Sequence, residues 1–204
     1  MNSILPARLQ QGLVLASASP RRADILTMLG FDFEVDPAHI EETQDGQATP
    51  AEHAQRLARD KARALSRTRS TGTSIGADTI VVCEDEILGK PKSFDDAIDM
   101  LRRLQGRWHT VYTGLALYDL SRGRGADAVA STQVRFRACT DDTLRRYVET
   151  GECDDKAGAY AIQGVGALLV EEIRGCYYNV MGLPIGCFLD LLQALRTTEV
   201  GHAG

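Results

Sequence analysis

Apolar residues occur along the chain in two patterns, one typical of strands and one typical of helices. Residues 12–17 form a short apolar run, as in a buried strand, and residues 20–29 place apolar side chains at helical spacing. Residues 31–35 alternate between apolar and acidic side chains, which predicts a half-buried strand. Residues 73–83 give the strongest strand signal because they are rich in β-branched side chains. Further strands are predicted over 87–88, 108–118, 128–136 and 168–173, and further helices after Thr49, Ser93, Thr140 and Pro184.

The order of these elements predicts an α/β fold. Some strands follow helices, whereas the strands over 108–118 and 128–136 follow one another and are expected to pair antiparallel. A flexible connection over 121–125 is expected to join them. This combination favours a mixed sheet flanked by helices over a purely parallel sheet.

Length and composition are those of a globular protein. The 204 residues are 44% hydrophobic and 25% charged, which is ordinary for a globular protein. A chain of this length can bury a sizeable core. We expect one domain over residues 1–204, with a lead-in over 1–11 and a disordered tail over 197–204. Neither a membrane-spanning helix nor a signal peptide is expected. The five cysteines are scattered without a C-x-x-C pair, so reduced thiols in a cytoplasmic protein are expected.

Charge and motif content exclude several classes of function. The net charge of -5 argues against broad binding to nucleic acid, which needs a basic face. A negative net charge still allows a small phosphorylated ligand to be held by a local cluster of Lys and Arg. The sequence contains no P-loop motif and no histidine spacing typical of a zinc hydrolase.

A strand-to-helix junction groups two hydroxyls, Ser17 and Ser19, with two guanidiniums, Arg21 and Arg22. Ser19 suits the N-cap of the helix, and Pro20 suits its first position. A helix N-terminus offers unpaired N–H groups and the positive end of the helix dipole to an anion, so the cluster is a candidate phosphate site. The alternative is an ordinary capped helix with two solvated arginines.

Two charged residues stand in apolar surroundings. Lys61 lies in or beside the apolar stripe of the helix that begins after Thr49, so it should have an anionic partner or else extend along the margin of the stripe to water. Asp78 interrupts the strand over 73–83 between apolar neighbours. A buried aspartate is costly unless it is paired, hydrogen-bonded or bound to a metal.

Together these residues indicate phosphate chemistry assisted by a metal. Lys90 at a strand end adds a further cation, and the loop residues Glu41 and Glu42 add carboxylates to that of Asp78. If these groups converge, the site would hold several phosphates and one Mg²⁺ or Mn²⁺, because oxygen ligands without His or Cys suit these ions. A carboxylate beside the metal can orient or deprotonate water for attack on phosphorus.

Six segments follow one another along the chain: Leu15–Arg22, Glu41–Glu42, Leu57–Ala62, Gly76–Val81, Gly89–Pro91 and Asp155–Gly164. Together, and in register, they resemble the Maf nucleotide pyrophosphatases, also called septum formation inhibitors. Asn179–Pro184 also fits, and the resemblance runs in order from about residue 12 to residue 196.

The resemblance implies hydrolysis of a nucleoside triphosphate between its α and β phosphates. The products would be a nucleoside monophosphate and pyrophosphate, as in housecleaning of nucleotide pools. The implied fold is an elongated mixed α/β sheet with a cleft between two lobes, similar to inosine triphosphate pyrophosphatases. A divalent metal cofactor, a homodimer and a cytoplasmic location are also expected, without nucleic acid or membrane partners.

The resemblance also implies roles for individual residues. Asp78 matches the proposed general base, and Glu42 (or Glu41) would hold the metal together with Asp78. Phosphate contacts and substrate binding are expected from Ser17, Ser19, Arg22, Lys61 and Lys90.

Three positions bear on substrate choice: Arg21, Thr79 and Gln163 match the branch that acts on dTTP and UTP. An amide at Gln163 offers a donor and an acceptor to a pyrimidine edge, although it could instead bond the loop backbone. The glycine-rich segment 153–166 predicts that the backbone approaches something closely there.

Two alternatives to a dTTP/UTP pyrophosphatase remain. One is an enzyme for 7-methyl-GTP or a modified nucleotide, and the other is a nucleotide-binding regulator of cell division with negligible turnover. A mere binder has no need of a metal-associated base such as Asp78.

Overall fold

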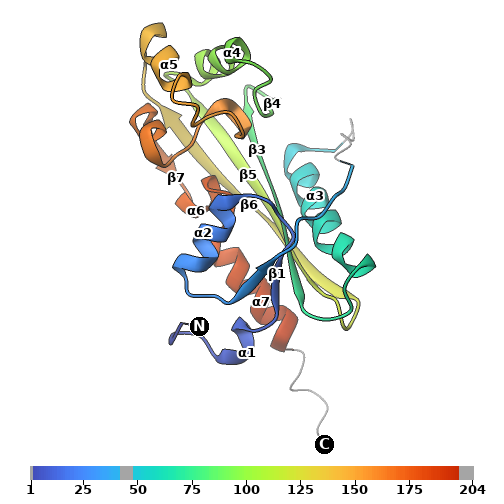
Figure 1. Ribbon diagram of the computed structural model, residues 1–204. Helices are drawn as coiled ribbons and strands as arrows, with labels where there is room; N and C mark the ends of the chain where they lie inside the picture. Colours follow the sequence, from blue (N-terminus) through green and yellow to red (C-terminus); the bar gives the residue numbers. More distant parts are fainter. Residues whose placement is uncertain (1, 42–47, 198–204) are drawn as a thin grey trace, which may run out of the picture. The chain divides into compact units, whose positions relative to one another are not determined.

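The computed structural model describes residues 2–41 and 48–197 (Figure 1). The chain divides into two compact units. Unit 1 comprises Met1–Asp78, Thr113–Ala130 and Gly182–Gly204, and unit 2 comprises Thr79–Tyr112 and Ser131–Met181. Thr197 is helical, not disordered as predicted, and from residue 198 on the predicted tail lies outside the described residues. The single domain and the cleft between lobes stay predictions.

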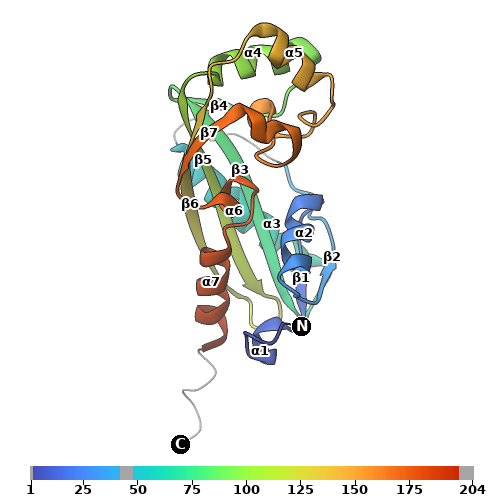
Figure 2. The same cartoon turned by 90° about the vertical axis from the view of Figure 1, so that its left-hand side faces the viewer.

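Strands and helices follow one another along most of the chain, as predicted (Figures 1 and 2). The strands are β1 (Leu13–Leu15), β2 (Phe33–Val35), β3 (Thr73–Cys83), β4 (Glu86–Leu88), β5 (Trp108–Asp119), β6 (Arg124–Phe136) and β7 (Val170–Arg174). The helices are α1 (Ala7–Gln10), α2 (Pro20–Met28), α3 (Pro50–Ala64), α4 (Phe94–Leu104), α5 (Asp141–Val148), α6 (Tyr177–Val180) and α7 (Ile185–Thr197), with the 3-10 helices η1 (Leu65–Arg67), η2 (Ala157–Ala159) and η3 (Gly164–Leu169).

The strands form one mixed sheet in the order β2-β1-β3-β5-β6-β7, with β4 paired to β3. β1 is parallel to both β2 and β3, and its Leu15 lies opposite Val35 and Ile75. β4 is antiparallel to β3, and β7 is antiparallel to β6. The predicted α/β fold with a mixed sheet flanked by helices is therefore confirmed.

Helices begin and end at the capping residues that the sequence contains. Thr49 closes a capping box on α3: its Oγ1 accepts from the N–H of Glu52 at 3.3 Å, and its own N–H donates to Glu52 Oε2 at 2.9 Å. Ser93 and Thr140 cap α4 and α5 through their hydroxyls. Gly30 follows α2 in the left-handed region at φ 73°.

Two glycines let α3 pack directly on the sheet of unit 1. A Cβ on Gly76 of β3 would lie 2.2 Å from the carbonyl oxygen of Ala58, and one on Gly114 of β5 would lie 2.2 Å from that of Ala54. Figure 1 shows α3 on one side of β3, with α2 and α7 on the other. Because strand side chains alternate between faces, Gly76 and Asp78 both face α3.

The opposite face of the sheet carries the apolar core of unit 1. Leu15 and Ile75 are fully buried. The ring of Phe188 on α7, also fully buried, meets the ring of Phe31 edge to face, with the centroids 5.3 Å apart.

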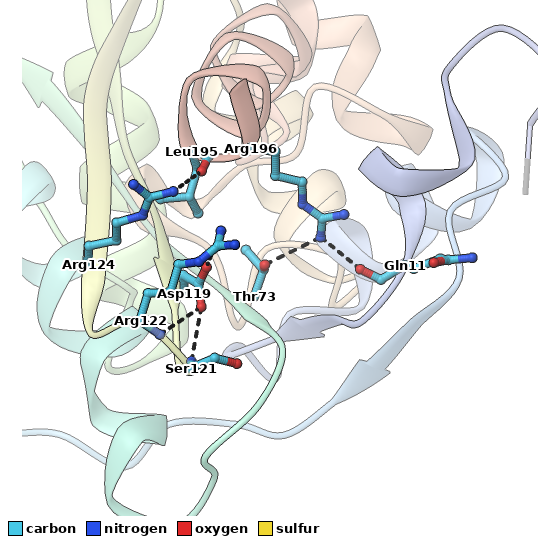
Figure 3. A network of polar contacts seen from close by, with 8 residues as sticks. All are labelled: Gln11, Thr73, Asp119, Ser121, Arg122, Arg124, Leu195 and Arg196. Atoms are coloured by element: carbon cyan, nitrogen blue, oxygen red, sulfur yellow. Dashed lines mark hydrogen bonds and ion pairs between the residues drawn. The ribbon is translucent and has the colours of Figure 1, made fainter. Parts of the chain in front are cut away.

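Polar contacts tie the C-terminal end of α7 to other segments of unit 1 (Figure 3). Arg196 Nη2 donates to the carbonyl oxygen of Gln11 at 2.7 Å and to Thr73 Oγ1 at 3.3 Å. Arg124 Nη2 donates to the carbonyl oxygen of Leu195 at 2.9 Å, in the last turn of the helix, where carbonyls have no intrahelical partner.

The connection between β5 and β6 is a tight turn closed by Asp119. The Oδ1 atom of Asp119 accepts from the N–H groups of Ser121 and Arg122, both at 3.0 Å (Figure 3). Arg124 already belongs to β6, so the connection is shorter than the flexible one predicted over 121–125. The side-chain closure of the turn explains the difference.

In unit 2, α4 and α5 lie side by side (Figures 1 and 2). Arg102 on α4 donates from Nε and Nη2 to the two carboxylate oxygens of Asp141 on α5, at 3.1 and 2.6 Å. The short helices α1 and α6 were not predicted, because four residues are too few to show a helical period. Across the described residues, no helix is both long enough and apolar enough to cross a membrane.

Replacing Gly76 by alanine should destabilise the protein strongly. The added methyl group would overlap the backbone of α3, and the overlap is relieved only by moving the helix away from the sheet, so we expect a loss of about 3 kcal/mol in the free energy of unfolding in urea. Gly186→Ala is the control, because a Cβ at Gly186 in the first turn of α7 would meet open space. This variant should keep or slightly raise stability. Similar stabilities of the two variants would contradict the close packing of α3.

Candidate active site

Lys61 and Asp78 form an ion pair on the face of β3 that α3 covers. Lys61 Nζ donates to Asp78 Oδ1 at 2.7 Å, and the two side chains are only 13% and 12% exposed. Lys61 lies between Ala58 and Ala62, the two residues of α3 whose backbone packs against Gly76. Lys61 thus has the anionic partner that its position required, and the buried carboxylate of Asp78 is paired, as expected.

The strand-to-helix junction holds a second polar cluster in unit 1. Arg22 is buried, and its guanidinium donates from Nη1 to Ser17 Oγ and from Nε to the carbonyl oxygen of Gly182, both at 2.8 Å. Ser17 Oγ also accepts from the N–H of Ser19 at 3.2 Å. Arg22 therefore joins the loop before α2 to the segment before α7.

The N-terminus of α2 differs from those of α3, α4 and α5. Each of those three helices has a hydroxyl cap and an acidic residue in its first turn. In α2, every residue of which the structure describes, Ser19 occupies the N-cap without a side-chain cap bond, and the first turn holds Arg21 and Arg22 with no acidic residue. Cations at the positive end of a helix are unfavourable by about 0.3–1 kcal/mol each, so the arrangement suits a bound anion.

The two clusters lie just beyond the parallel pairing of β1 with β3. The N–H of Ala16 donates to the carbonyl oxygen of Ile75 at 2.9 Å, which continues the pairing of β1 with β3. Ser17 comes next after Ala16, and Asp78 lies three residues beyond Ile75. In α/β sheets, ligands bind outside the carboxyl ends of strands, so the cluster that follows β1 lies where a ligand of unit 1 is expected, whereas Asp78 lies within β3.

One predicted metal ligand is described and the other is not. Asp78 is described, whereas Glu42 lies outside the described residues; Glu41, the alternative, is described and exposed. Over residues 2–41 and 48–197, no three His, Cys, Asp or Glu side chains are grouped so as to hold a metal ion. Mg²⁺ is usually held by one or two carboxylates together with water and substrate phosphates, so the carboxylate oxygens of Asp78 fit this ion.

The remaining candidate residues lie in unit 2. Thr79 follows Asp78 on β3 and is half-buried, and its side chain points to the opposite face of the strand. Lys90 is exposed just after β4, and the carbonyl oxygen of the preceding Gly89 accepts from the N–H of Gly158 at 3.0 Å. This bond joins the Lys90 segment to the glycine-rich loop. The convergence of these residues with the candidates of unit 1 stays a prediction.

The glycine-rich segment 153–166 makes the close backbone approaches that its composition predicted. A Cβ on Gly158 would lie 3.0 Å from the side chain of Val81, and one on Gly164 would lie 1.8 Å from Glu152 Oε1. Both glycines also have positive φ, at 71° and 63°. Gln163 is exposed, immediately before η3.

A buried aromatic cluster anchors the same loop and was not predicted from the sequence. Tyr160 Oη and His109 Nε2 lie 2.8 Å apart, and both rings meet Phe136 edge to face. Burial lowers the pKa of His109 to about 4, so its imidazole is neutral at neutral pH. The one signal for this cluster was a histidine among the aromatic residues of the strand predicted over 108–118.

The five cysteines form no disulfide with one another. Burial raises the pKa of the thiols of Cys83, Cys139 and Cys153. A raised pKa keeps these thiols protonated and poorly nucleophilic, so they act as small apolar side chains.

Comparison with known proteins decides the family. A family model described as "Maf-like protein" matches residues 12–195. The chain belongs to the Maf family.

Three relatives illustrate the similarity. A protein of Moorella thermoacetica is 50% identical over 180 residues, which cover 88% of this chain and 93% of the relative. Proteins of Syntrophus aciditrophicus and Desulforamulus reducens are 46% and 45% identical over 91% and 89% of this chain, and over 90% and 95% of their own lengths. All three relatives are named dTTP/UTP pyrophosphatase.

The Maf match includes every candidate residue, from Ser17 in unit 1 to Gln163 in unit 2. The family follows from similarity along the chain, whereas the pairing of Lys61 with Asp78 follows from the geometry. The role of each individual side chain in the site stays a prediction.

Lys61 and Asp78 should be energetically coupled. Lys61→Met or Asp78→Asn alone leaves a largely buried charge without its partner, so each should lower the free energy of unfolding by about 2 kcal/mol, less than for a fully buried pair. The double variant should lose less than the sum, by at least about 1 kcal/mol, in urea unfolding. Strictly additive losses would show that the pair contributes nothing.

Burial of His109 should make stability depend on pH. Its folded pKa of about 4 lies below the unfolded value of 6.5, so the unfolded chain binds the extra proton between these values. Stability is therefore lost as pH falls from 6.5 to 4, by about 3 kcal/mol in total. His109→Gln should show a smaller loss between pH 7 and pH 4.5 in urea unfolding. An equal loss in both proteins would rule out His109 as the source.

Proposed function

We propose that this Maf protein is a nucleoside triphosphate pyrophosphatase that hydrolyses dTTP and UTP between the α and β phosphates. The products are the nucleoside monophosphate and pyrophosphate, which suits housecleaning of nucleotide pools. The observation that carries the proposal is 45–50% identity, over about nine-tenths of the chain, to relatives named dTTP/UTP pyrophosphatase.

Asp78 is the proposed general base. Lys61 holds one carboxylate oxygen of Asp78, which fixes the side chain and directs Oδ2 as the acceptor for a proton of the attacking water. The ammonium of Lys61 also lies close enough to the base to stabilise negative charge that develops on a nearby phosphate.

The junction before α2 is the proposed phosphate site of unit 1. Arg22 orients Ser17 by a direct hydrogen bond, and Ser19 begins a helix whose positive end is not neutralised by an acidic first turn. Lys90 supplies a further cation from unit 2. These groups would bind the triphosphate and stabilise the pyrophosphate as it leaves.

Asp78 and Glu42 would hold the divalent cation, Mg²⁺ or Mn²⁺. When bound, this ion would neutralise phosphate charge and make the attacking water more acidic. Arg21, Thr79 and Gln163 would select the pyrimidine, with the amide of Gln163 matching the alternating carbonyl and N–H groups of uracil or thymine. We also propose that the protein forms a homodimer and is located in the cytoplasm.

The proposal is tested by pyrophosphate release from dTTP, UTP, CTP, ATP, GTP and 7-methyl-GTP with Mg²⁺ or Mn²⁺. We expect dTTP and UTP to be the best substrates. Asp78→Asn should lower kcat for UTP at least about 100-fold, because the base can no longer accept a proton. Asp142→Asn is the control, since Asp142 is exposed on α5 with its side chain 72% accessible.

Each failure of this test has its own meaning. Full turnover by Asp78→Asn would show that another group is the base. Preference for 7-methyl-GTP would reassign the substrate, and triphosphate binding without hydrolysis under either ion would identify a regulator instead of an enzyme.

A further inference from the structure

Glu152 forms a clamp beneath the turn that follows Gln163. Its Oε1 accepts from the N–H of Val165 at 3.1 Å, and its Oε2 accepts from the N–H of Gly166 at 2.7 Å. Both donors belong to the first turn of η3, where backbone N–H groups have no intrahelical acceptor. Hydrogen bonds to a carboxylate are roughly twice as strong as neutral ones, so this one side chain fixes the start of η3.

The glycines of the turn make the clamp possible. A Cβ on Gly164 would lie 1.8 Å from Glu152 Oε1, and one on Gly166 would lie 3.1 Å from Glu152 Oε2 and 2.3 Å from the carbonyl oxygen of Ala161. The backbone can therefore sit directly on the carboxylate only because these positions carry no side chain.

The segment before Gln163 is held from the same side. Tyr147 Oη accepts from the N–H of Ala161 at 3.0 Å. Burial raises the pKa of the Tyr147 hydroxyl, so it stays protonated across the neutral range. Thr150 Oγ1 donates to the carbonyl oxygen of Tyr147 at 2.6 Å and accepts from the N–H of Glu152 at 3.2 Å, which attaches the clamp to the end of α5.

Gln163 thus lies between two fixed points. Tyr147 holds the backbone two residues before it, and Glu152 holds the backbone two and three residues after it. Gln163 itself is exposed, so its side chain remains accessible to a ligand while its backbone is held. A fixed backbone narrows the directions that the amide can take, and a site that reads hydrogen-bonding groups depends on such orientation.

We propose that Glu152 is a positioning residue for base selection, which holds the Gln163 turn so that the amide faces the pyrimidine edge. The inference rests on the proposed function, because it assumes that Gln163 contacts the base. Glu152 itself touches no substrate and acts through Gln163.

Glu152→Gln is the sharpest variant, because it keeps the size of the side chain. The amide retains one acceptor oxygen, but its NH₂ group then faces a backbone N–H, so one of the two bonds is lost. The matched control is Glu149→Gln, which removes the same charge from an exposed side chain three residues earlier.

The experiment measures kcat and KM for UTP and for CTP. These two nucleotides differ in the hydrogen-bonding groups of the base, which an amide side chain can distinguish. Glu152→Gln should raise KM for UTP about tenfold with kcat changed less than about twofold, and it should leave kcat/KM for CTP nearly unchanged. Selectivity for UTP over CTP then falls about tenfold. Gln163→Ala should lose at least as much selectivity, and adding Glu152→Gln to it should cause no further loss.

A second measurement keeps this inference separate from the proposed function. Hydrogen exchange of peptides that contain Val165 and Gly166 should be faster in Glu152→Gln than in the wild-type protein and in Glu149→Gln. Faster exchange with an unchanged UTP/CTP ratio would overturn the role in selection while leaving the proposed function intact. An equal fall for UTP and CTP would indicate a merely structural role. A wild-type protein that cleaves neither triphosphate would overturn the proposed function, and the selective role with it.

Discussion

The direct packing of α3 on the sheet of unit 1 is the constraint on which the candidate active site depends. Gly76 and Gly114 remove the side chains that would hold the helix away, so the backbone of α3 reaches the strands. At this distance Lys61 meets Asp78 with a 2.7 Å bond. A longer spacing between helix and strand would separate the Asp78 carboxylate from the Lys61 ammonium and leave it in apolar surroundings without this partner.

A buried ion pair that joins a helix to a strand carries a desolvation penalty. Two apolar side chains of similar size often stabilise such a contact as well or better, because charged groups lose their hydration on burial. The pair between Lys61 and Asp78 is therefore better explained by chemistry than by stability. The cationic N-terminus of α2 supports the same argument, since two arginines at the positive end of a helix dipole suit a bound anion.

Unit 2 positions its candidate residues differently, through hydrogen bonds to a glycine-rich backbone. Gly158 packs on Val81 and donates to Gly89, while Glu152 lies beneath the turn after Gln163. In such a loop the side chain of Gln163 is exposed while the backbone on either side of it is held by hydrogen bonds, which suits the selection of a base. The match to the Maf family spans the polar clusters of unit 1 and the loop of unit 2 alike.

Local interactions let the sequence by itself determine the helices and most strands of this protein. The capping box at Thr49, the hydroxyls of Ser93 and Thr140 and the left-handed Gly30 act over three or four residues, so their effects are visible in the sequence. The same reasoning required a partner for Lys61 and a close approach for the glycines after residue 153. Only the tertiary structure decided that these partners are Asp78 and Glu152, because a pairing between distant residues depends on which elements pack together and in what register. The phosphate junction from Ser17 to Arg22 was visible in the sequence as a cluster, but its attachment to Gly182 was not, for the same reason.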